Sequence, residues 1–330
     1  MATYAITGSS GYIGTRMTRW LLERDARDQV LGFDVRPPRV SHPRLEHHEL
    51  DVRDPRLGEL IAGREVDALL HFAFIVDPLY DEREMTDIDL GGTRNVLDAV
   101  LAARIPYLLA TSSTTAYGAL PDNPVPLAEE HPTRAPRAFV YAHDKKLMDE
   151  MLRDFAAAHP EVAVCIVRPC IVLGPTVSNY IAATMLDQPV GALIDGQDPP
   201  FQFIHEDDLA RMLGLCVEKR ATGIFNAVGA GQVTPRQVAR LQGKRSVSVP
   251  HWLVRSLLWG VQRTRLLPFS MPPGILEYYR WPWVASGERA RRELGFEPSH
   301  DARQVFDIVL RRKDEILAAY RSQMAQRARR

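Results

Sequence analysis

The segment Tyr4–Gly14 restricts the possible folds more than any other part of the chain. It reads Tyr-Ala-Ile-Thr-Gly-Ser-Ser-Gly-Tyr-Ile-Gly, an apolar strand followed by glycines at intervals of three, and helical periodicity follows over 12–24. In such a strand–turn–helix unit, Gly8 allows the tight turn, Gly11 lets the backbone approach a pyrophosphate, and Gly14 lets the helix pack on the strand. The helix N terminus then faces the phosphates with its partial positive charge. An ordinary glycine-rich turn is the alternative that this spacing alone leaves open.

A carboxylate at the end of the second predicted strand supports the phosphate-binding interpretation. Asp34 ends the apolar run 30–34 and lies 20 residues after Gly14, where an acidic side chain accepts hydrogen bonds from the adenosine ribose. A carboxylate there repels a 2′-phosphate, so the sequence favours NAD over NADP, although the nearby Arg36 can accommodate that phosphate. Asp51-Val52 follows the third strand, and is either a contact of the adenine edge or a polar turn at a strand end.

Strands and helices alternate through the first part of the chain. The predicted strands are 3–8, 30–34, 47–50, 68–73, 107–112, 162–167 and 223–228, and the predicted helices include 12–24, 87–104, one that carries Tyr141, and 207–218. This alternation predicts βαβ units and therefore an α/β fold with a Rossmann-type, doubly wound parallel sheet.

After Pro169 the alternation weakens, and two loop-rich stretches predict a smaller C-terminal substrate domain interleaved with the first. We expect a nucleotide-binding domain over 1–170, to which about 204–228 returns, a substrate domain over about 171–203 and 229–315, and a basic tail over 316–330.

Tyr141 and Lys145 stand four residues apart, which places both side chains on one face of the predicted helix. A free tyrosine has a pKa of about 10, too high for a base at neutral pH. A lysine ammonium and an oxidised nicotinamide beside it both favour the tyrosinate. Tyr141 can then take the proton of an alcohol as hydride leaves its carbon, or return that proton in reduction, while Lys145 also holds the nicotinamide ribose.

Hydroxyl side chains gather after the fifth predicted strand, in the run Thr111–Gly118, which reads Thr-Ser-Ser-Thr-Thr-Ala-Tyr-Gly. Ligands of α/β proteins bind at the carboxyl ends of parallel strands, so one of these hydroxyls can hydrogen-bond the reacting oxygen. A Ser/Thr-rich turn that caps a helix is the alternative, and it would be preferred if the tyrosine were absent.

Together these residues resemble the extended short-chain dehydrogenase/reductase family, in the NAD-dependent epimerase/dehydratase branch that also contains 3β-hydroxysteroid dehydrogenases. The resemblance runs through nearly the whole chain. It is carried by Thr7–Gly14 (TGxxGxxG), His71–Phe74 (HxAA), Ser113 four residues before Tyr117-Gly118, Tyr141 with Lys145 (YxxxK), Arg168-Pro169, Gly174-Pro175, Phe203–Asp208 and Glu293–Phe296. Asp89 stands where the family usually has asparagine.

The resemblance implies a role for each matching residue. Tyr141 is the acid/base, Lys145 lowers its pKa and binds ribose, and Ser113 orients the substrate oxygen. The implied NAD contacts are Gly8, Ser10, Gly11, Tyr12, Ile13, Gly14, Asp34, Asp51, Val52, Phe72, Ala73, Tyr141, Lys145 and Pro169. The resemblance also implies a homodimer formed through the helices that flank the tyrosine. The number and spacing of the three cysteines fit no zinc site, so we expect no metal.

Two departures bear on the substrate. Ile171 occupies a position where nucleotide-sugar enzymes of the family commonly have asparagine, and Phe201 occupies that of an arginine. Phenylalanine cannot replace the charge-assisted bonds by which arginine holds a diphosphate. The substrate region is rich in aromatics, which form either core or an apolar ligand pocket: Trp252, Trp259, Phe269, Tyr278, Tyr279, Trp281 and Trp283. The stretch 251–267 either packs on the second domain or is an amphipathic helix at a membrane surface.

The sequence therefore predicts an NAD-dependent oxidoreductase that acts on a secondary alcohol or its ketone. A nucleotide-sugar epimerase or dehydratase with tightly bound NAD is the first alternative, and a non-catalytic NAD-binding regulatory protein is the second. Lys+Arg and Asp+Glu are 41 each, so bulk charge gives no support for a nucleic-acid partner. No apolar run is long enough to span a membrane, the first strand leaves no room for a signal peptide, and three cysteines form no disulfide framework, so we expect a cytoplasmic protein.

Overall fold

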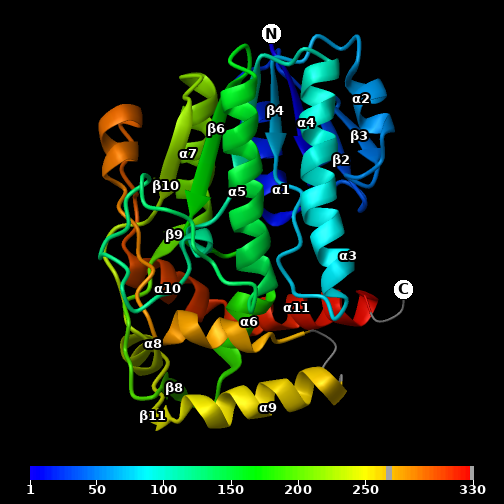
Figure 1. Cartoon of the computed structure of the whole chain (residues 1–330). Coiled ribbons are helices and arrows are strands. Elements are labelled where there is room, and N and C mark those ends of the chain that lie inside the picture. The colour runs from blue at the N-terminus through cyan, green and yellow to red at the C-terminus, as the bar shows by residue number, and fades with distance from the viewer. Residues whose placement is uncertain (265–269, 328–330) are drawn as a thin grey trace.

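The computed structural model describes residues 1–264 and 270–327, and a seven-stranded parallel sheet forms its centre (Figure 1). The strands follow the order β10-β6-β5-β4-β1-β2-β3. The chain thus starts in the middle of the sheet and winds outward on both sides, which confirms the predicted Rossmann-type fold. The strand bounds are β1 Thr3–Thr7, β2 Gln29–Asp34, β3 Leu45–Glu49, β4 Ala68–His71, β5 Tyr107–Thr111, β6 Ala163–Pro169 and β10 Gly223–Ala227.

Helices cover both faces of the sheet, because successive strand residues point to opposite sides. In β5, Tyr107 and Leu109 enter one buried cluster with α1 and α7. Leu108 and Ala110 enter the other cluster, with α2, α4 and α5. The helix bounds are α1 Tyr12–Arg24, α2 Arg56–Ile61, α4 Gly92–Ala102, α5 Val140–Ala158 and α7 Glu206–Glu218.

The predicted helix 87–104 is not a continuous α-helix. α3 (Glu82–Thr86) runs into a π-helical turn, η1 (Asp87–Gly91), before α4 begins. The start of α4 approaches the loop after β3 so closely that a Cβ on Gly92 would lie 2.4 Å from Val52 Cγ1. Single π-turns are frequent at functional sites, and this one carries the buried Asp89.

The C-terminal part forms a lobe beneath the sheet in the view of Figure 1. It contains two small parallel pairs, β7 with β9 and β8 with β11, and a third buried cluster formed with α6, α8, α10 and α11. The bounds are β7 Ile171–Leu173, α6 Tyr180–Asp187, β8 Gly191–Ile194, β9 Phe203–His205, α8 Pro235–Leu241, β11 Ser246–Val249, α9 His251–Thr264, η3 Pro273–Tyr279, η4 Ala290–Leu294, α10 Ala302–Arg311 and α11 Lys313–Arg327.

The stretch 316–330, expected as a basic tail, is helical as far as Arg327. Ile316, Tyr320 and Met324 of α11 are buried in the third cluster, together with residues of α6. Their spacing of four residues gives α11 one apolar stripe, so the described part of this stretch is a packed helix rather than a tail, and 328–330 lie outside the described residues. Of the helices in the described ranges, none has the length and apolarity needed to cross a bilayer.

Candidate active site

The glycine loop turns from β1 into α1, and the backbone around it leaves no room for side chains. Gly8 has φ +72°, in the left-handed region that favours glycine, and a Cβ there would lie 2.6 Å from the Ala73 nitrogen. A Cβ on Gly14 would lie 2.0 Å from the Gly8 carbonyl oxygen. Gly11 is the N-cap of α1 and gives it no side-chain cap, so the first amides of α1 are left for an anion. Ile13, two residues after Gly11, packs against the core.

Asp34 is buried at the end of β2 and is engaged by protein groups. Its carboxylate accepts hydrogen bonds from the Ser10 and Arg36 amides, each at 3.0 Å, and from Arg36 Nε at 3.1 Å. The Arg36 side chain is 39% exposed, and a Cβ on Gly11 would lie 3.6 Å from its guanidinium. The carboxylate thus lies beside the glycine loop, as predicted, with a cation that neutralises part of its charge.

Of the other predicted adenosine and ribose contacts, Phe72 and Ala73 lie against the glycine loop, whereas Asp51 is paired with an arginine. The backbone of Phe72 and Ala73 lies against Gly8, within 2.8 Å of the position of an added Cβ. Asp51 is instead held by Arg53, whose guanidinium lies 2.7 Å from its carboxylate and keeps the pKa of Asp51 below its usual range. This pairing favours the strand-end turn as the explanation of Asp51.

Tyr141 and Lys145 lie in the first two turns of α5, and Phe74 covers both. The Phe74 ring meets the Tyr141 ring edge-on at 5.8 Å, and its centroid is 3.5 Å from Lys145 Nζ. Lys145 Nζ donates a hydrogen bond to the Thr111 carbonyl at 2.7 Å, which ties α5 to the carboxyl end of β5. Because Phe74 follows Phe72 by two residues, the chain beyond β4 joins the glycine loop to the tyrosine and lysine. From the sequence, Phe74 was named only as the last residue of the His71–Phe74 motif and was given no role, and its position just after a strand was the available signal.

Burial sets the protonation of both groups. It raises the pKa of Tyr141 to about 12, and a hydrogen bond with Ser113 offsets part of that rise. It lowers the pKa of Lys145 to about 7, against the opposing effect of Asp89 and Asp149. The expectation that Lys145 lowers the pKa of Tyr141 is therefore not met by the protein's own groups, because burial of the phenol outweighs them.

Ser113 both caps a turn and hydrogen-bonds Tyr141, so its role as a cap leaves the predicted contact with a reacting oxygen open. Its Oγ accepts a hydrogen bond from the Thr115 amide at 3.1 Å and so begins the 3-10 turn η2 (Thr114–Tyr117). The same hydroxyl lies 3.5 Å from the Pro169 carbonyl, to which it can donate. Pro169, another predicted cofactor contact, therefore adjoins the serine at the carboxyl end of β6.

A buried polar chain joins β1, β4 and α4 next to this site. His71 Nδ1 is 2.7 Å from Thr7 Oγ1, and His71 Nε2 is 3.1 Å from Thr93 Oγ1. Burial lowers the pKa of His71 to about 3, so the ring is neutral near pH 7. One Asp89 oxygen accepts from the Ile75 amide at 2.8 Å, whereas the other has no hydrogen-bond partner among the described residues. Burial raises the pKa of Asp89 well above its usual range.

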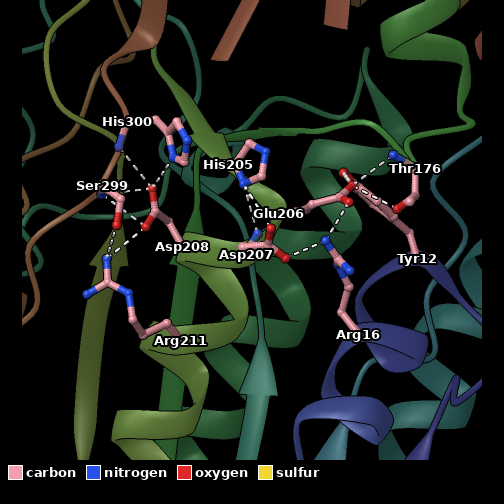
Figure 2. A network of polar contacts seen from close by, with 10 residues as sticks. All are labelled: Tyr12, Arg16, Thr176, His205, Glu206, Asp207, Asp208, Arg211, Ser299 and His300. Atoms are coloured by element: carbon pink, nitrogen blue, oxygen red, sulfur yellow. Dashed lines mark hydrogen bonds and ion pairs between the residues drawn. The ribbon is translucent and has the colours of Figure 1, made fainter. Parts of the chain in front are cut away.

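A second polar network joins α1 to the C-terminal lobe (Figure 2). Glu206, buried at the start of α7, accepts a hydrogen bond from the Tyr12 hydroxyl and one from Thr176 Oγ1 at 2.8 Å. Arg16 Nη2 lies 2.8 Å from the Glu206 carboxylate. Tyr12, predicted as a cofactor contact, thus points toward the lobe. Farther along the network, Asp208 binds Arg211, Ser299 and His300.

The two positions that depart from the family pattern are packed among apolar groups. Phe201 is buried, with its ring edge-on to Tyr279 at 5.4 Å and 6.4 Å from Trp283. Ile171 lies partly buried in β7 and packs against the clusters that contain these aromatics. The other aromatics divide. Tyr278 is core, Trp252 and Trp259 are exposed, and Phe269 lies outside the described residues.

A protein-family model, NAD dependent epimerase/dehydratase family, matches residues 4–228. An uncharacterized protein of Mycobacterium tuberculosis is 26% identical over 323 residues, which cover 93% of this chain and 82% of that protein. A dTDP-glucose 4,6-dehydratase structure from Streptomyces venezuelae has a TM-score of 0.74 and 21% identity, covering 97% of this chain and 99% of that one. A UDP-glucose 4-epimerase from Bifidobacterium longum, in complex with NAD+ and UDP, has a TM-score of 0.73 and 18% identity, covering 95% and 98%. At these identities the structural likeness is one of fold.

Proposed function

This chain belongs to the NAD-dependent epimerase/dehydratase family, and we propose that it is an oxidoreductase that transfers hydride between NAD and the carbon of a secondary alcohol or its ketone. One observation supports this proposal most: Tyr141, Lys145 and Ser113 lie together at the carboxyl end of the sheet. Phe74 contacts Tyr141 and Lys145, and the residues just before it lie against the glycine loop. A regulatory protein that only binds NAD needs no acid/base group in that place.

The protein's groups fit NAD at both ends. At the adenosine end, the uncapped start of α1 and the Asp34 carboxylate suit a pyrophosphate and a ribose. At the other end, Lys145 and Tyr141 suit a ribose and a reacting oxygen. When bound, NAD supplies the hydride acceptor or donor, and its oxidised ring carries a positive charge.

Tyr141 handles the proton in this proposal. Its pKa of about 12 keeps the phenol protonated near pH 7, so it is ready to donate when a ketone is reduced. In the oxidative direction a positive charge beside the phenol is needed to lower that pKa. The Ser113 hydroxyl, which already bonds Tyr141, orients the substrate oxygen toward the same proton.

The substrate we favour carries little charge. Phe201 is buried against Tyr279 where an arginine would hold a diphosphate, and Ile171 adds a second apolar group. Phosphate oxygens placed there would lose water without gaining charge-assisted bonds. The alternative, epimerisation or dehydration of a nucleotide sugar, has the support of the relatives whose structures are similar.

Calorimetric titration of the NAD-loaded protein with UDP, dTDP and GDP separates the two. We expect no detectable heat of binding from any of the three nucleotides. In a separate assay, we expect NADH to form when the NAD-loaded protein is given apolar secondary alcohols. Binding of one nucleotide with a dissociation constant of about 1 μM would instead support the nucleotide-sugar alternative.

A further inference from the structure

Helix α9 exposes large apolar side chains on the side that faces away from the protein. No residue of the helix is buried. Val254, Leu258 and Val261 recur at helical spacing and are partly buried, so they form the inner stripe. The opposite side is the α9 outer face, which consists of Trp252, Leu253, Leu257 and Trp259, exposed by 67%, 38%, 61% and 61%.

The charged side chains of α9 itself are basic, and the carboxylates near the helix come from other elements at its two ends. No Asp or Glu occurs between Glu218 and Glu277, although the whole chain has 41 acidic residues among 330. Arg255 and Arg263 of α9 are exposed, and the Arg263 guanidinium lies 5.6 Å from the centroid of the Trp259 ring.

At the start of the helix, Glu277 pairs with His251, which is the first residue of α9. Two further carboxylates lie at the helix ends: Asp195 accepts from the His251 amide at 2.8 Å, and Glu82 accepts from Gln262 at 3.5 Å. His251 and Gln262 are partly buried, so the exposed α9 outer face itself carries apolar side chains and arginines and no carboxylate of its own helix.

We propose that the α9 outer face binds an anionic lipid bilayer, with the helix lying in the plane of the surface. In such helices the apolar side enters the headgroup region while arginines reach the lipid phosphates. Tryptophan is the residue that prefers the headgroup level, because its ring is apolar and its N–H needs a polar partner. Figure 1 shows α9 along the lower edge of the molecule, at the end remote from the N terminus, so a flat surface can reach it.

Charge distinguishes this partner from a second copy of the chain. In a twofold contact through the α9 outer face, Arg255 and Arg263 of one copy would face the same arginines of the other. No acidic residue of α9 would neutralise them. Like charges across an interface oppose association, whereas anionic lipid headgroups complement both arginines.

Sedimentation with lipid vesicles tests the proposal on the full chain. We expect binding to vesicles of equal parts phosphatidylglycerol and phosphatidylcholine, weakened by added salt, and little binding to pure phosphatidylcholine. The double variant Trp252→Ala/Trp259→Ala should lose at least about tenfold in vesicle affinity, because both rings leave the headgroup region. Arg255→Gln and Arg263→Gln should each lose about fivefold.

Two variants on other parts of the surface serve as matched controls. Val125→Ala removes an apolar side chain that is 55% exposed, and Arg303→Gln removes an arginine that is 72% exposed. Neither should change vesicle binding, and all variants should keep the wild-type thermal unfolding midpoint because each changed side chain is exposed.

Three outcomes would overturn the proposal. The first is absence of wild-type binding to the anionic vesicles. If light scattering then shows a dimer that becomes a monomer in the double-tryptophan variant, the α9 outer face binds a second copy of the chain instead. The second is equal binding by wild type and the double-tryptophan variant. The third is equal binding to anionic and neutral vesicles, since the arginines would then have no part in it.

Discussion

Arg36 weakens the repulsion that Asp34, beside the glycine loop, would exert on a 2′-phosphate. Asp34 alone would repel a 2′-phosphate, but Arg36 Nε lies 3.1 Å from its carboxylate and offsets its charge. The preference between NAD and NADP therefore depends on the pair rather than on the aspartate.

Arg36→Ala should lower NADP affinity by about tenfold relative to NAD affinity, because the carboxylate is then unshielded and the phosphate loses a cation. Fluorescence titration with both cofactors measures the ratio. Arg27→Ala is the matched control, since Arg27 pairs with Asp25 at the same spacing of two residues. Equal losses for both cofactors would contradict the prediction.

Asp89 gives a second test at the residue scale. Its pKa is raised by burial, so above a pH of about 4 the folded protein holds a proton that the unfolded chain has released. The free energy of unfolding therefore falls as pH rises from about 4 toward the raised pKa of folded Asp89. Asp89→Asn has no proton to release there, so it should remove this fall in stability. At pH 7 we expect the variant to have a higher free energy of unfolding than wild type. The difference should be about 1.4 kcal/mol for each pH unit above about 4 over which Asp89 of the folded wild type stays protonated, and it should disappear near pH 4.

Urea unfolding at both pH values measures this difference. Asp98→Asn, an exposed change on the adjoining helix α4, should show no such pH dependence. An Asp89→Asn variant that is less stable than wild type at pH 7 would mean that the carboxylate is ionised and stabilising.

At this scale the sequence predicted the glycines, Tyr141 and Lys145, because spacing along one chain segment decides which side chains share a loop or a helix face. It could not predict the pKa values, because the burial that shifts them comes partly from Phe74, which lies 67 residues before Tyr141.

At the scale of elements, the position of α5 is fixed by a buried ion pair. Arg168 of β6 donates to the two Asp149 oxygens at 2.7 and 2.8 Å, and to the Tyr117 hydroxyl at 2.8 Å. Asp149 lies one turn beyond Lys145 and two beyond Tyr141. The pair therefore holds the rotation of α5 that turns both site residues toward the carboxyl end of the sheet.

Asp149→Asn should lower the free energy of unfolding by about 3–5 kcal/mol, because it leaves the Arg168 guanidinium buried without its counter-charge. Chemical denaturation followed by circular dichroism measures the change. Asp154→Asn, an exposed substitution on the same helix, should cost little. A loss below about 1 kcal/mol for Asp149→Asn would show that the pair is not what anchors α5.

Periodicity located most elements to within a few residues, including α1 and the strands of the sheet. It missed the π-turn before α4, since one extra residue in a turn hardly changes a helical pattern. It also missed the packing of α11, where a basic composition masked the stripe formed by Ile316, Tyr320 and Met324. Of the two interpretations of 251–267, packing on the second domain fits the partly buried inner stripe of α9 but not the exposed rings of Trp252 and Trp259, and 265–267 lie outside the described residues.

At the scale of the whole molecule, the network of Figure 2 joins the nucleotide-binding half to the lobe. Tyr12 and Glu206 are 194 residues apart in the chain, so no local pattern could reveal their contact. Because α1 begins at Tyr12, the same contact couples the glycine loop to the segment around Thr176.

Glu206→Gln should lower the unfolding free energy by about 3 kcal/mol, since Arg16 loses its buried partner and keeps only the exposed Asp207, and one buried acceptor becomes a donor. Urea unfolding is the measurement, with one transition expected for both halves. Asp207→Asn is the control, because Asp207 also pairs with Arg16 but is 60% exposed. Equal effects of the two changes would contradict a special role for Glu206.

The homodimer implied by the family resemblance stays a prediction. Light scattering after size-exclusion chromatography tests it, and a mass near 37.2 kDa at working concentration would reject it.

Turnover by the NAD-loaded Tyr141→Phe variant tests the central claim most directly. The measurement is NADH formation from apolar secondary alcohols, with Tyr4→Phe, at the opposite end of β1 from the glycine loop, as the control. We predict that Tyr141→Phe keeps NAD affinity but loses about 100-fold to 10 000-fold in turnover, because only the proton-transfer group is removed. Turnover equal to that of wild type would contradict the assignment of Tyr141 as the acid/base.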